Sequence, residues 1–110
     1  MKQQYIIQNP TKAEILLAKE GYFLAESTTT QINKFLSYPF LKYIRSQGYQ
    51  VNVKEKQIVV TQVCEDTTPD SVLSFDRAQM SVSHDSHDLW LMASEIKAIY
   101  MRMQELKYYD

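Results

Sequence analysis

A run of metal-ligating side chains lies late in the sequence, His84-Asp85-Ser86-His87-Asp88. Imidazole and carboxylate groups bind transition metals, and two histidines three residues apart on one helical turn can share an ion. A site needs three or four ligands, however, and the chain has no other histidine and only one cysteine. The same residues suit a helix start, with Asp85 or Ser86 as N-cap and Asp88 near the positive helix end. The sequence therefore predicts a cap here, with no metal site and no cofactor.

The only cysteine available as a nucleophile is Cys64, with His84 or His87 as its base. The neighbouring acids Glu65 and Asp66 disfavour the thiolate, which is the reactive form of a cysteine. The two glycines of the chain are far apart, so no glycine-rich phosphate-binding loop is present in the sequence. We therefore expect a protein that is not an enzyme.

The composition is that of an ordinary globular domain, with 45% hydrophobic and 23% charged residues and a net charge of −1. A length of 110 residues predicts a single domain, residues 1–110. No apolar run approaches the ~20 residues of a membrane span, and we expect no secretory segment because the apolar run near Tyr5 is short. We expect a cytoplasmic protein with no membrane partner.

The elements that must position these side chains begin with a short strand, residues 4–8. Asn9-Pro10 then favours a helix start, and a helix is predicted over 11–20, ending at Gly21. Residues 31–37 place Ile32, Phe35 and Leu36 on one helical face. They predict a second helix, followed by a third over 39–47, with one kinked helix over 30–47 as the alternative.

The second half begins with the clearest β pattern. Alternation over 49–53 and a β-branched run over 58–63 predict a hairpin with a charged tip. Residues 71–83 are ambiguous between a helical turn and a further strand, and a helix is expected from Ser86 onward. The fold class predicted is α+β: a short N-terminal strand, two to three short helices, an antiparallel hairpin or three-stranded sheet, and a long C-terminal amphipathic helix.

The C-terminal helix carries a seam of apolar residues at alternating three- and four-residue steps, as in a heptad repeat. Trp90 and Tyr100 widen this apolar face. We expect the helix to pack on its own domain and to leave apolar surface for a second copy, as a homodimer, or for another protein. The seam consists of Leu89, Met92, Ile96, Ile99, Met103 and Leu106.

The order of elements over residues 10–63 is similar in layout to a winged helix-turn-helix. In that layout Lys42 and Arg45 lie on the helix that enters the major groove, and Lys54 and Lys56 on the hairpin contact phosphates. Against it, the proposed reading helix is rich in apolar side chains. Tyr38 is also a candidate partner-binding residue, because tyrosine is favoured at protein interfaces.

The leading hypothesis is a non-catalytic protein-binding domain, such as an adaptor or a small inhibitor of a larger complex, of the accessory type found in phages and mobile elements. The alternative is a winged-helix DNA-binding regulator that dimerises through its C-terminal helix, so that nucleic acid is a second class of partner. The residues predicted to bind a partner are Tyr38, Lys42, Arg45, Lys54 and Lys56.

Overall fold

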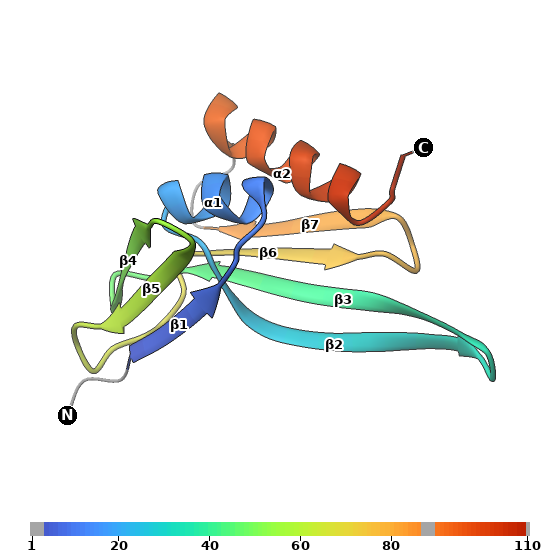
Figure 1. The fold of residues 1–110 in the computed structure, drawn as a ribbon, viewed down its shortest axis with the longest axis horizontal. Helices are drawn as coiled ribbons and strands as arrows, with labels where there is room; N and C mark the ends of the chain where they lie inside the picture. Colours follow the sequence, from blue (N-terminus) through green and yellow to red (C-terminus); the bar gives the residue numbers. More distant parts are fainter. Residues whose placement is uncertain (1–3, 87–89, 110) are drawn as a thin grey trace.

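The computed structural model describes residues 4–86 and 90–109, and antiparallel β-sheet dominates them (Figure 1). The elements in chain order are β1 (Gln4–Gln8), α1 (Lys12–Lys19), β2 (Phe23–Asn33), β3 (Leu36–Arg45), β4 (Tyr49–Lys54), β5 (Gln57–Gln62), β6 (Ser71–Asp76), β7 (Ser81–Ser86) and α2 (Ala93–Glu105). The predicted α+β class, with its two to three short helices between the first strand and the hairpin, is therefore wrong.

The strands form two antiparallel sheets. One has three strands in the order β1-β5-β4, and the other has four in the order β2-β3-β6-β7. Both helices lie on one face of the four-stranded sheet, and the β2–β3 hairpin extends well beyond them (Figure 1). This arrangement leaves β2 at one edge of the larger sheet and β7 at the other.

The helices predicted over 31–37 and 39–47 are wrong because these residues belong to β2 and β3. The segment contains four aromatic residues, Phe35, Tyr38, Phe40 and Tyr43, and aromatic side chains favour a pleated and half-buried surface. Pro39 lies just beyond the last β3–β6 pair, Phe40 with Asp76, and its carbonyl still accepts from the Arg77 backbone at 3.2 Å. Proline is tolerated at this end of the ladder because it has no N–H to donate to a partner strand.

The first helix is confirmed, with a different start. Its N-cap is Thr11, whose side chain accepts from the Glu14 backbone while the Glu14 carboxylate accepts from the Thr11 backbone. This reciprocal pair satisfies two N–H groups that the first turn of a helix leaves open. The helix ends before Gly21, which has a φ of 90°.

The hairpin predicted over 49–63 is confirmed as β4 and β5, and β1 completes its sheet. The C-terminal helix starts at Ala93, later than expected, because Ser81–Ser86 forms β7. The capping role predicted for Asp85 and Ser86 is therefore wrong. His87, Asp88 and Leu89 lie outside the described residues.

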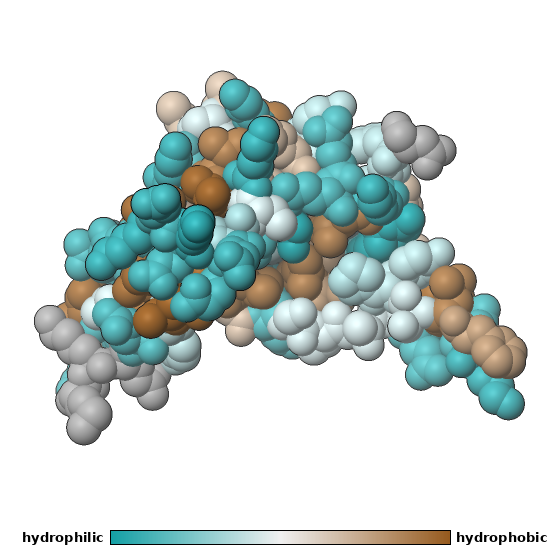
Figure 2. Space-filling view, viewed as in Figure 1, coloured by the Kyte–Doolittle hydropathy of each residue, from teal (hydrophilic) through white to brown (hydrophobic). Residues whose placement is uncertain are grey.

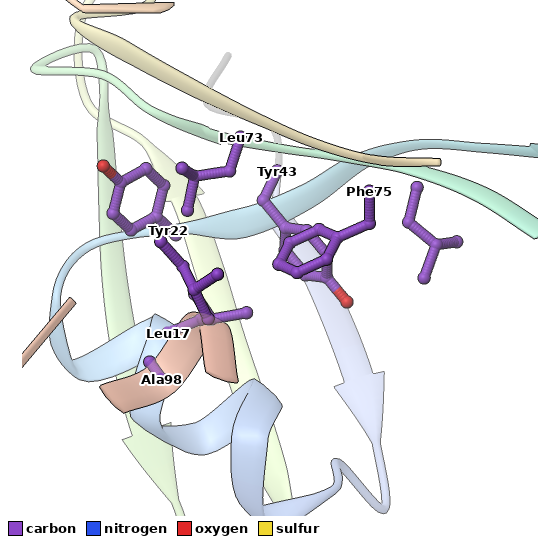
Figure 3. Packing of buried hydrophobic residues seen from close by; sticks show 8 residues of the cluster. Leu17, Tyr22, Tyr43, Leu73, Phe75 and Ala98 are labelled. Atoms are coloured by element: carbon purple, nitrogen blue, oxygen red, sulfur yellow. The ribbon is translucent and has the colours of Figure 1, made fainter. Parts of the chain in front are cut away.

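Two clusters of buried side chains hold these layers together. The larger one fills the space between the four-stranded sheet and the helices, where Tyr43 and Phe75 meet edge to face with ring centroids 5.5 Å apart (Figure 3). The smaller one joins the three-stranded sheet to α1 and to the start of β2. Its buried members are Ala18, Phe23, Ile58 and Val60.

Candidate functional site

The start of α2 is held by a buried carboxylate, Glu95. Its Oε1 accepts hydrogen bonds from the Tyr22 hydroxyl at 2.9 Å and from the Arg45 guanidinium at 3.0 Å, and its Oε2 accepts from the Met92 backbone at 2.8 Å. Burial alone would raise the pKa of Glu95, but these donors and the charge of Arg45 together lower it. One acid thus connects the helix to β3 and to the residue before β2.

Next to this carboxylate, Ser71 and His84 form a pair that resembles the core of a nucleophilic site, with Oγ and Nε2 3.2 Å apart. The serine is fully buried, and its Oγ also hydrogen-bonds the Tyr22 hydroxyl at 2.7 Å. Burial is the main reason that the pKa of Tyr22 is raised to about 12. The pair therefore connects β6 with β7, and through Tyr22 it is linked to the Glu95 carboxylate of α2.

The side chains weighed from the sequence as candidate metal ligands do not form a cluster in the part of the chain that the structure describes. His84 and Asp85 lie on β7, and the other two candidate ligands of that run lie outside the described residues. Within residues 4–86 and 90–109, no group of three His, Cys, Asp or Glu side chains could hold a metal ion. Cys64 is exposed, with its Sγ 3.4 Å from the backbone oxygen of Asp66.

The residues predicted to bind a partner are distributed over two sheets. Lys42 faces Glu26 across the β2–β3 ladder, and Arg45 forms an ion pair with the buried carboxylate of α2. The Tyr38 ring packs under the Arg77 guanidinium, 4.7 Å from its centroid. Lys54 and Lys56 lie at the β4–β5 turn of the other sheet. These five residues therefore lie on strands and a turn of two different sheets and not on one recognition helix.

The predicted apolar seam is divided between the two sides of α2. Ile99, Met103 and Leu106 pack against the core. Met92 and Ile96 are exposed instead, and Ile96 keeps 53% of its surface open to solvent. Tyr100, Tyr109 and Trp90 are exposed as well, and the two tyrosine rings lie 5.7 Å apart. We call this set the helix flank: Trp90, Met92, Ile96, Tyr100 and Tyr109.

Sequence reasoning missed a second exposed feature, the arm formed by the β2–β3 hairpin. The arm extends away from the rest of the molecule, and apolar side chains gather at its end (Figure 2). Phe35, at the turn, is 90% exposed, and Ile32 and Leu36 beside it are also exposed. The ammonium of Lys34 lies 5.8 Å from the Phe35 ring centroid. The spacing of Ile32, Phe35 and Leu36 predicted a helical face, but these three residues lie at the tip of a hairpin.

A half-open cavity of about 370 Å³ lies where the two sheets meet. The start of β2 bounds it on one side and β1 on another. The Phe23 and Tyr49 rings contact edge to face inside it, with centroids 4.9 Å apart. Its lining is mostly apolar and consists of Tyr5, Ile7, Phe23, Leu24, Ala25, Ile44, Tyr49 and Val60.

Comparisons of this chain with protein-family models, with curated proteins and with solved structures found no match. Neither helix in the described part of the chain has the length and apolar character that a membrane span requires.

Proposed function

We propose that this protein is a non-catalytic binding domain that docks another protein on the helix flank. The observation that supports this most directly is the exposure of large apolar side chains on a firmly anchored helix, where Ile96 is 53% and Tyr100 49% exposed, together with Trp90, 73% exposed, in the segment that leads into it. Aromatic residues and methionine are enriched at the centre of protein interfaces, and contiguous exposed apolar patches mark such sites. An adaptor and a small inhibitor would both act by occupying a surface in this way.

The anchoring of α2 supports the same proposal. Its first turn is fixed by Glu95, and its last turn by Arg102, which donates to the Tyr43 hydroxyl at 3.0 Å and to Glu105 at 2.9 Å. The Glu105 carboxylate in turn accepts from the Thr11 hydroxyl at 2.6 Å, which ties α2 to α1. A rigid helix loses little conformational freedom when a partner binds, so more of the interaction contributes to affinity.

The Ile96→Asp variant is expected to bind the partner at least 30-fold more weakly, since a charge would enter the centre of an apolar interface, where a hot-spot residue is worth about 2 kcal/mol or more. Ser94→Asp is the matched control, because it adds the same charge at an exposed position of α2 outside the helix flank. Both variants should fold normally. The measurement is affinity capture from extracts of the source organism, followed by titration of the purified partner.

A partner retained by the wild type and by Ser94→Asp but lost by Ile96→Asp would support the helix flank. Equal retention of the same partner by all three proteins would contradict it.

The DNA-binding alternative is not supported by the fold of the described residues, because the helix it needs over 39–47 is β3. Titration with duplex DNA at low and at physiological salt tests this directly, since binding through phosphates weakens steeply with salt. We expect no saturable binding at either salt concentration. Tight, strongly salt-dependent binding would contradict a protein-only function.

A further inference from the structure

The outer edge of β2 is long and lacks the usual protection. Its regular part, residues 26–31, runs between two register irregularities, and Ser27, Thr28 and Thr29 are exposed. Natural proteins block such edges with lysine, proline, bulges, a short strand or a covering element. The irregularities of β2 lie only at the two ends of its regular part. β2 has eleven residues, with no lysine and no proline, and Glu26 is its only charge. The strand therefore presents backbone donors and acceptors that a further strand can use.

We propose that this edge pairs with the β2 edge of a second copy of the chain, antiparallel and centred on Thr29. A two-fold axis then joins the two four-stranded sheets into one continuous sheet. In this register Thr28 faces Thr30 of the partner subunit and Ser27 faces Gln31 of the partner subunit. Cross-strand threonine pairs stabilise antiparallel sheets, and strand addition to an open edge is a common mode of association.

Charge complementarity favours the antiparallel arrangement. It brings the turn of each arm, which carries Lys34, toward the end of β2 of the other copy that carries Glu26. Opposite charges at such positions contribute favourably to strand pairing. The two-fold axis therefore gives the dimer two such pairs, each formed by Glu26 of one copy and Lys34 of the other.

The same antiparallel arrangement accounts for the exposed tip of the arm. Phe35 lies in the hairpin turn, and the pairing brings this turn to the start of β2 of the other copy, where Phe23 lines the cavity between β1 and β2. Each copy has an exposed apolar tip and a half-open apolar cavity of about 370 Å³. Pockets of roughly 300 Å³ and more accommodate small apolar groups, so one phenyl ring fits. The second copy therefore completes the cavity with its own Phe35.

Cysteine crosslinking tests the register. In a Cys64→Ser background, Thr29→Cys would face itself across the two-fold axis, with Cα atoms about 4.5–5.5 Å apart. A disulfide spans Cα separations of about 4.4–6.8 Å, so mild oxidation should give a covalent dimer. Thr28→Cys is the matched control: it would lie diagonally from its counterpart, about 7–8 Å away, and should crosslink poorly. Equal crosslinking of the two variants would overturn the register.

Sedimentation equilibrium tests the interface. The wild type should be a dimer, and Thr29→Lys should raise its dissociation constant about 100-fold by placing two ammonium groups opposite each other. Phe35→Ser should raise it about 10-fold, while both variants keep the wild-type circular dichroism spectrum because both positions are exposed. A wild type that stays monomeric at high concentration would overturn the proposal. So would a dimer that Ile96→Asp dissociates and Thr29→Lys does not, since its interface would be the helix flank.

Discussion

Replacing Glu95 with alanine is expected to lower the free energy of unfolding by about 3 kcal/mol. The carboxylate is 4% exposed and accepts from the Tyr22 hydroxyl, the Arg45 guanidinium and the Met92 backbone. Its removal leaves these donors without their acceptor. The free-energy cost of a buried donor with no acceptor exceeds the net stabilisation that one hydrogen bond contributes. Thermal unfolding followed by circular dichroism measures the loss, with a shift in the midpoint of roughly 4 °C or more for each kcal/mol.

The same residue should make stability depend on pH. The pKa of Glu95 is lower in the folded protein than its ordinary value of 4.5. A lowered folded-state pKa stabilises the protein above the unfolded pKa, and that contribution is lost as the pH falls through the folded value. The difference in unfolding free energy between the wild type and Glu95→Gln should therefore be largest near neutral pH and should shrink below about pH 4.5.

The control for both measurements is Glu55→Gln, which makes the same exchange at an exposed position of the β4–β5 turn. It should change neither the stability at neutral pH nor the acid limb of the profile. If Glu95→Gln behaved like Glu55→Gln, the carboxylate would not be the anchor of α2.

Local patterns predicted the elements whose determinants are close together in the chain. Strict alternation over 49–53 identified the hairpin. Asn9-Pro10 and Gly21 identified α1, although its N-cap is Thr11. In both cases the residues that determine the element lie within about fifteen positions of each other. A short stretch of sequence therefore contains the information that decides the structure.

The arm could not be predicted in this way. Ile32, Phe35 and Leu36 match a helical face, yet they form the exposed end of a hairpin. The choice of strand over helix depends on the pairing of β2 with β3 as far as Phe23 and Ile44, and on the pairing of β3 with β6 from Phe40 onward. Such non-local pairing overrides a short local pattern.

The candidate site was predicted in part. An apolar seam was expected on the C-terminal helix with surface left over for a partner, but the pattern alone could not show which seam residues face the core. Glu95 decides this, because its three donors fix the rotation of α2 about its axis. Those donors come from positions 22, 45 and 92, and only the fold brings the first two to the helix.

The Gly48→Ala variant is also expected to lose about 3 kcal/mol of stability, for reasons of space. Gly48 lies in the turn between β3 and β4, where its carbonyl accepts from the Val63 backbone at 2.8 Å. A Cβ atom there would overlap the Asp66 carbonyl oxygen and lie 2.9 Å from the Thr67 Cα. Both obstacles are backbone atoms, so the loop after β5 would have to shift as a unit.

Gly21→Ala is the control, because it also replaces a glycine with alanine but causes no overlap with backbone atoms. Gly21 has a φ of +90°, which strains an alanine by about 1–2 kcal/mol, but its added Cβ would meet only side-chain atoms of Arg45, at 3.1 Å, and no backbone. Unfolding in urea should therefore show a clearly larger loss for Gly48→Ala than for Gly21→Ala. The reverse order would mean that the loop over residues 63–70 moves freely away from the β3–β4 turn, and that the close packing of these two segments contributes little to the fold.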